Sequence, residues 1–319
     1  MINALTTIAR QEGIAGEANN AFAKLSDEIL NHPDFDGQCI RYANERTEAL
    51  LMRPYLSKIT STESRYVPMR GALSAYYSKL VHTGEEGLTL SDVHQASLQG
   101  CDLGSRNRVT GLINALQSVG VVKVETSLFD RMERILRMTE MGKQVLSRIR
   151  HSTVDRVSSL LDIRLAEEGH PDHYSDLSRY YARGFALANT ELRISAIYPQ
   201  YAAFFDRTFG LELLNLLFIA ATKSGSPRAG GISFSYSKMS EKFDISRAQM
   251  RQLVVHCQEV GLIEVHGLGG RETEITQKFI DLYRQIAAST FAISAISLMT
   301  DQQLQSYLET DRTQFARTA

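Results

Sequence analysis

The sequence has little that is typical of a secreted, membrane-spanning or metal-binding protein. Its 319 residues include three cysteines, which lie far apart and have no histidine or cysteine neighbour at metal-ligand spacing: Cys39, Cys101 and Cys257. We therefore expect buried thiols in a reducing cytoplasm and no metal site. The first residues lack the apolar core of a signal peptide, and the most apolar run, residues 211–221, is too short to cross a bilayer. These absences predict a cytoplasmic protein without a membrane partner.

Excess charge and catalytic motifs are also missing. The net charge is −1, so a globally basic nucleic-acid binder is excluded and any such site must come from local asymmetry. No HExxH, P-loop, GxGxxG or nucleophile–base set is present, which favours a protein that is not an enzyme and binds no cofactor. The hydrophobic content of 43% and the charged content of 22% are typical of soluble globular domains. The chain is long enough for two or three of them.

Residues 105–142 carry the clearest local pattern. Ser105 can cap a helix, whose apolar residues follow at spacings of three and four: Val109, Leu112, Ile113, Leu116 and Val119. Gly120 is suited to end that helix, and a valine-rich run at 121–124 predicts a strand. A charged tip then precedes a return strand at 136–138 and contains Asp130, Arg131, Glu133 and Arg134. Helix, strand, charged tip and strand in this order predict the second half of a winged helix-turn-helix.

The charged hairpin resembles the wing of the multiple-antibiotic-resistance regulators (MarR family). That wing has a D-x-R tip and an L-T-x-x-G close before a long helix. Asp130 matches the first position of the tip, and Met132 stands where the family has arginine. Met138, Thr139 and Gly142 occupy the positions of the L-T-x-x-G motif that ends the wing. The resemblance covers roughly residues 88–150. It implies a DNA-binding transcriptional regulator with two recognition helices, and it leaves open a small-molecule effector bound between the helices and the winged domain.

The chain also repeats itself. The HPD motif at 32–34 recurs at 170–172, an offset of 138, whereas four later positions recur at an offset of 141: Ser105, Arg106, Val119 and Gly120 match Ser246, Arg247, Val260 and Gly261. We expect an N-terminal arm (1–20), a first repeat (21–150, winged part about 70–150), a second repeat (159–288, winged part about 210–288) and a helical tail (289–319). The expected helices include 70–82, 154–168 and 196–208. The predicted fold is mainly α, with tandem winged helix-turn-helix domains, small β-wings and helices like those of a dimerisation domain.

The two predicted recognition helices differ in their polar faces. In the first, the proposed base contacts are Asn107, Arg108, Thr110 and Asn114, with Gly111 allowing close approach, and the proposed phosphate contacts are Ser105, Arg106, Arg131, Arg134 and Arg137. In the second, weaker contacts are expected from Arg247, Gln249, Arg251, Gln252 and Arg271. Residues 105–150 contain nine Lys/Arg against four Asp/Glu, whereas residues 246–288 contain five of each. The first module is therefore the better candidate for DNA.

Two other residue groups have both a structural and a functional interpretation. The histidines before the two Pro-Asp pairs, His32 and His170, fit a turn better than a metal or pH site. A set of aromatics fits a hydrophobic core better than an effector pocket: Tyr180, Tyr181, Tyr198, Tyr201, Phe204, Phe205 and Phe209.

The leading hypothesis is a sequence-specific regulator that binds double-stranded DNA as a covalent pseudo-dimer, monomeric or as a homodimer. The first alternative is a tandem winged-helix protein–protein subunit, as in bacterial chromosome-condensation complexes, which suits the near-neutral charge. A plasmid replication initiator ranks third, because such proteins are usually strongly basic.

Overall fold

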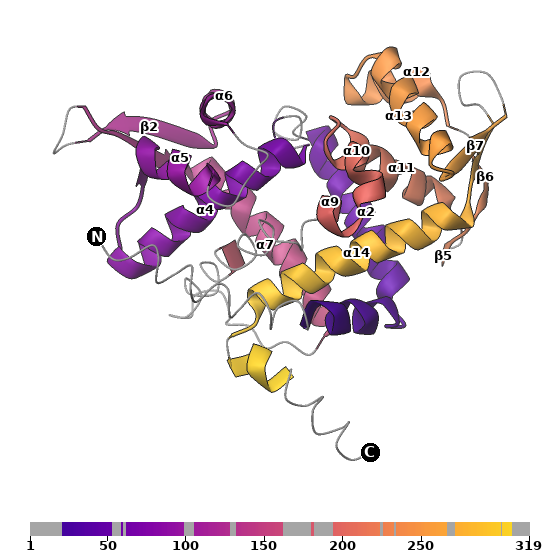
Figure 1. Ribbon diagram of the computed structural model, residues 1–319, viewed down its shortest axis with the longest axis horizontal. Helices are drawn as coiled ribbons and strands as arrows, with labels where there is room; N and C mark the ends of the chain where they lie inside the picture. The colour runs from indigo at the N-terminus through magenta and orange to yellow at the C-terminus, as the bar shows by residue number, and fades with distance from the viewer. Residues whose placement is uncertain are drawn as a thin grey trace. The chain divides into compact units, whose positions relative to one another are not determined.

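Helices make up most of the described structure, together with small antiparallel sheets, so the expected mainly helical class is confirmed (Figure 1). A computed structural model describes residues 21–52, 59, 62–98, 105–127, 132–161, 180–181, 194–223, 226–232, 234–266, 272–300 and 302–307. They fall into two compact units: unit 1 draws on residues 1–29, 64–198 and 289–319, and unit 2 on residues 30–63 and 199–288. No helix among the described residues is both long and apolar enough to span a bilayer.

Unit 1 contains a small sheet with helices before, between and after its strands. In chain order these are a helix at 21–30, α4 (Glu63–Thr83), β1 (Leu88–Thr89), α5 (Leu90–Leu98), α6 (Arg106–Ser118), β2 (Val122–Thr126), β3 (Arg134–Met138), α7 (Glu140–Leu160) and α9 (Ile194–Ile197). The sheet order is β1-β3-β2, with both pairs antiparallel. We call β2–β3 the first hairpin. The second half of α14 (Gln277–Leu298) and a short helix at 302–307 complete the unit.

The predicted turn between α6 and the first hairpin is present in detail. Ser105 has extended backbone, and its hydroxyl accepts a hydrogen bond from the N–H of Arg108. Gly120 ends the helix with φ of 73°, in the left-handed region that glycine tolerates. The hydroxyl of Thr139 then donates to the carbonyl oxygens of Gly120 (2.5 Å) and Val121 (3.1 Å), and it accepts from the N–H of Gly142. Thr139 thus joins the end of α6 to the start of α7.

Unit 2 has a similar order of elements, with an additional two-stranded sheet, β4–β5. It contains α2 (Phe35–Met52), the 3-10 helix η1 (Pro199–Tyr201), α10 (Ala202–Phe205), α11 (Gly210–Ala221), β4 (Thr222–Lys223), β5 (Ser226–Pro227), β6 (Gly230–Ile232), α12 (Tyr236–Phe243), α13 (Arg247–Glu259), β7 (Ile263–Val265), β8 (Thr273–Ile275) and the first half of α14. Its larger sheet has the order β6-β8-β7, and β7–β8 is the second hairpin. Gly261 has φ of 72°, and the hydroxyl of Thr276 donates to the carbonyl oxygens of Gly261 (3.0 Å) and Leu262 (2.9 Å).

Hydrophobic side chains fill each unit separately. In unit 1 the inner face of α6 packs with the sheet, and its predicted apolar residues are buried: Val109, Leu112, Ile113 and Leu116. In unit 2 the ring of Phe218 on α11 stacks on Tyr283 of α14 at 3.9 Å, and the Tyr283 hydroxyl donates to Asn215 at 2.7 Å. Burying one such large side chain contributes about 1.5–3 kcal/mol, so these contacts hold the helices in place.

Several expected element boundaries are wrong. The helix expected at 154–168 does not start there, because α7 is continuous from Glu140 to Leu160. The boundary expected between residues 288 and 289 is where the two compact units divide, although α14 is continuous across it. The single helix expected at 196–208 is broken into α9, η1 and α10. The helix expected from residue 70 begins at Glu63 and includes Pro68. Pro199 stands where the helix expected at 196–208 is broken, whereas residues 140–160 contain no proline and α7 continues through them.

The ambiguous aromatics, the HPD turn and the thiols have structural roles. Five aromatics from the predicted set are buried: Tyr181, Tyr201, Phe204, Phe205 and Phe209. Around His32 the chain makes a turn in which its ring Nδ1 accepts from the N–H of Asp34, while the second HPD motif, with His170, lies outside the described residues.

Cys39 and Cys257 are buried, and burial raises the pKa of the Cys257 thiol to about 12. A thiol with that pKa stays protonated and is a poor nucleophile. Cys101 lies outside the described residues.

Candidate nucleic-acid interface

The outer face of α6 holds the predicted contact residues of the first module. Ser105, the residue that caps the helix, is exposed, and so are the five other predicted residues on this segment: Arg106, Asn107, Arg108, Thr110 and Asn114. Gly111 lies on the same exposed face, where an added Cβ would meet no atom within 4 Å. Within the described part of the chain, the side-chain amides of Asn107 and Asn114 have no hydrogen-bond partner. A free amide can bond adenine bidentately, so this face has suitable chemistry for base edges.

Thr110 is more constrained than the sequence suggests. Its hydroxyl donates to the carbonyl oxygen of Arg106 at 3.0 Å, and it lies 2.9 Å from Nε2 of His94 on α5. A hydroxyl has one hydrogen, so His94 must donate through Nε2 in this contact. Thr110 therefore connects α6 to α5, whereas the side-chain amides of Asn107 and Asn114 remain available for a ligand. Sequence reasoning missed His94, which lies 16 residues earlier and outside any local pattern.

The first hairpin separates its two described arginines into different environments. Arg134 is exposed and pairs in register with Thr126 at the outer end of the strands. Arg137 is held at the base, where Nη1 donates to the carbonyl oxygen of Glu86 (2.5 Å) and Nε lies 3.2 Å from the Glu125 carboxylate. Arg137 therefore stabilises the hairpin and is less exposed than Arg134. Arg131 lies outside the described residues, and Met132, at the position of the family's arginine, is 90% exposed.

Glu125 contacts two cations on this hairpin. The Lys123 ammonium lies 2.5 Å from its carboxylate, and Arg137 contacts the other oxygen. The hydrogen bond from Lys123 is the largest cause of a lowered pKa of the Glu125 carboxyl, with Arg137 adding to it. Lys123 was not among the predicted contacts, although it is exposed and on the same hairpin.

The outer face of α13 forms a surface hollow in the second module. Arg247, Gln249, Arg251 and Gln252 are all exposed as expected, but Gln249 is held in a capping box with Ser246 (3.1 Å in both directions). The hollow, which we call the α13 hollow, has a volume of about 720 Å³, and its lining includes Arg207, Arg247, Arg251, Val255, His256 and Glu259. Arg207 comes from the segment before α11, and only tertiary packing brings it to α13. Arg271 lies outside the described residues.

The second hairpin has the opposite charge to the first. Glu264 and Glu274 are register partners on β7 and β8, and His266 Nε2 lies 3.7 Å and 3.6 Å from their carboxylates. The ligand atoms of these three exposed residues lie within 4.8 Å of one another, close enough to hold a divalent cation. Glu272 adds a further exposed carboxylate. The described residues of this hairpin contain no lysine or arginine.

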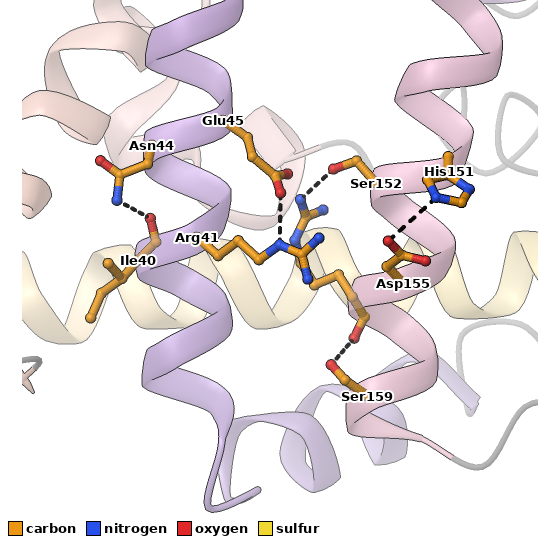
Figure 2. Close-up of polar contacts among 9 residues, drawn as sticks. Ile40, Arg41, Asn44, Glu45, His151, Ser152, Asp155 and Ser159 are labelled. Atoms are coloured by element: carbon orange, nitrogen blue, oxygen red, sulfur yellow. Dashed lines mark hydrogen bonds and ion pairs between the residues drawn. The ribbon is translucent and has the colours of Figure 1, made fainter.

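Several exposed polar side chains on α2 and α7 pair with neighbours in their own helix. Figure 2 shows Arg41 bonded to Glu45 at 2.8 Å, and Asn44 donating to the carbonyl of Ile40, both on α2. It also shows His151 near Asp155 on α7 at 3.7 Å. Such pairs are typical of solvated helix surfaces.

Comparison of the chain with protein-family models, with curated proteins and with solved structures finds no match.

Proposed function

We propose that the chain is a sequence-specific DNA-binding transcriptional regulator, a covalent pseudo-dimer of MarR-like winged helix-turn-helix modules. The observation that carries the DNA-binding function is the outer face of α6, where Asn107, Arg108 and Asn114 are exposed beside the open Gly111. A helix bearing exposed amide and guanidinium groups, followed by a β-hairpin, is suited to reading the major groove while the hairpin contacts the backbone.

Matching hydrogen bonds in the two units support the duplication. Thr139 and Thr276 each donate to the left-handed glycine and to the next residue after a 13-residue helix, and both begin a long helix. The sheet orders β1-β3-β2 and β6-β8-β7 correspond as well. Unrelated domains would share such side-chain detail only by coincidence.

Contacts exchanged between the two repeats support the pseudo-dimer. In unit 1, Tyr181 of the second repeat stacks on Tyr77 of α4 at 4.8 Å, and its hydroxyl donates to the Leu146 carbonyl of α7 at 3.0 Å. In unit 2, α2 of the first repeat packs on α11, the counterpart of α4. Asp36 on α2 pairs with Arg284 on α14, the counterpart of α7, at 2.8 Å. Tyr181 of the second repeat thus packs in unit 1 and α2 of the first repeat packs in unit 2, an exchange like that of intertwined dimers.

Fluorescence anisotropy with random-sequence duplex DNA over a range of salt concentrations tests the DNA-binding function. The double variant Arg106→Gln/Arg108→Gln should weaken binding and flatten the slope of log affinity against log salt, by up to about two if both arginines contact phosphate. Arg41→Gln/Arg148→Gln is the charge-matched control, because both residues are exposed on other helices, and it should leave the slope unchanged. Absence of DNA binding at low salt would reject the proposal.

A protein–protein subunit of a chromosome-condensation or segregation complex is the second candidate. The acidic second hairpin favours it, since three exposed glutamates there would repel phosphate. In that case the α6 variants should leave partner binding unaltered and no salt-dependent DNA affinity should be measured.

A further inference from the structure

The α13 hollow has a graded charge pattern that the DNA-binding function does not use. Arg247, Arg251, Val255 and Glu259 recur at every fourth residue, so one line along α13 is basic, then apolar, then acidic. Arg207 adds a third cation from outside the helix. From Arg247 to Val255 the helix rises about 12 Å, the length of roughly four residues of extended peptide.

The three arginines of the α13 hollow are not neutralised by carboxylates of the described residues. None of Arg207, Arg247 and Arg251 forms an ion pair with a carboxylate of the described residues. Three like charges around one hollow repel one another, and an anion bound there would relieve that repulsion. Arginine forks bind carboxylates in a bidentate manner, which adds orientation as well as affinity.

The other end of the hollow is suited to a side chain that is not acidic. Val255 is 41% exposed, which is unusual for a large aliphatic residue on a polar helix face. Beside it, Nε2 of His256 is buried and has no hydrogen-bond partner among the described residues, while Nδ1 lies 3.5 Å from Glu259. An apolar group of a ligand can therefore cover Val255.

Duplex DNA fits this surface poorly. A recognition helix in the major groove places its hairpin near the phosphates. The second hairpin would bring Glu264, Glu272 and Glu274 there. The capping box also occupies Gln249, one of the few side chains that could read a base. A short peptide avoids the hairpin altogether.

We propose that the α13 hollow binds a short acidic peptide segment of a protein partner. Two carboxylates of the segment pair with Arg247, Arg251 and Arg207, and the next apolar side chain packs on Val255. This docking does not depend on whether α6 reads DNA.

Fluorescence anisotropy tests it with labelled heptapeptides in which two acidic residues precede one leucine or phenylalanine. The full-length chain should bind members of this set, and peptides with asparagine and glutamine in place of the acids should not bind. Arg247→Gln and Arg251→Gln should each weaken binding about tenfold, which corresponds to about 1.4 kcal/mol. Val255→Asp should weaken it further. Circular dichroism checks that these exposed substitutions leave the fold intact.

The matched control is Arg106→Gln/Arg108→Gln, which removes the same charges from α6. It should weaken DNA binding under the proposed function and leave peptide affinity unchanged, so the two proposals fail separately. The docking proposal is overturned if no acidic peptide binds below 1 mM or if the α6 control weakens peptide binding equally. It is also overturned if removing Arg247 and Arg251 lowers the salt slope of DNA binding by about two, because α13 would then contact phosphates.

Discussion

Replacing Gly111 with alanine should raise stability and weaken DNA binding at the same time. Gly111 lies in the middle of α6, and its added Cβ would meet no atom within 4 Å. Alanine in an exposed helix interior is favoured over glycine by about 1 kcal/mol. The added methyl therefore finds open space in the free protein, and the melting temperature should rise by about 2–4 °C. On DNA that space is filled, because the methyl would stand between the helix and the base edges.

We expect a loss of DNA affinity of about tenfold, near 1.4 kcal/mol. The measurement combines thermal melts with anisotropy on a duplex selected from random sequence. Gly37→Ala on α2 is the control, because Gly37 is exposed and equally open. It should stabilise the chain somewhat less, being in a first turn, and leave affinity unchanged. A stabilised Gly111→Ala chain with undiminished affinity would refute a close approach of α6 to DNA.

Three further predictions concern the wing, the base contacts and a buried acid. Replacing Arg131 and Arg134 with alanine should change the salt slope of DNA binding by roughly two, and an unchanged slope would place the hairpin tip off the DNA. Arg108→Ala should lower specific affinity more than non-specific affinity, by about 1–3 kcal/mol of discrimination; equal losses in competition assays would make it a phosphate contact. Burial raises the pKa of the Glu212 carboxyl, although Arg46 opposes the shift. The folded-state pKa then exceeds the unfolded one, so ionisation destabilises the fold as pH rises. Glu212→Gln should therefore raise the melting temperature at neutral pH, with a gain that disappears toward pH 4, and a gain that persists there would exclude this cause.

Local patterns in the sequence predict the elements whose causes are themselves local. The spacing of Val109, Leu112 and Leu116 predicts the buried side of α6, and Ser105 predicts its first residue to within one position. Ser246 and Gln249 likewise predict the capping box of α13. In each case the interacting atoms are at most a few residues apart.

Tertiary contacts decide the features that the sequence does not predict. The sequence predicts Arg137 as a phosphate contact because it is a basic residue of the hairpin. Its guanidinium group instead donates to the carbonyl of Glu86, 51 residues earlier, which holds it at the base of the hairpin. Arg207 reaches the α13 hollow from a segment 40 residues before Arg247. The sequence also does not predict that α7 is continuous from Glu140 to Leu160. The recurring motifs indicate where a repeat begins, but they do not indicate where a helix ends.

Under the proposed pseudo-dimer, covalent joining of the two modules accounts for the opposite charges of their hairpins. At corresponding places, the first hairpin has Lys123, Glu125 and Arg137, and the second has Glu264, His266 and Glu274. In a homodimer one sequence supplies both hairpins, so an acidic hairpin on one half-site means an acidic hairpin on the other. A single chain that encodes both modules is free of this constraint. It can keep one basic module for DNA and change the other for a different ligand, and the arginine-lined α13 hollow beside an acidic hairpin has the charge pattern expected of that second role.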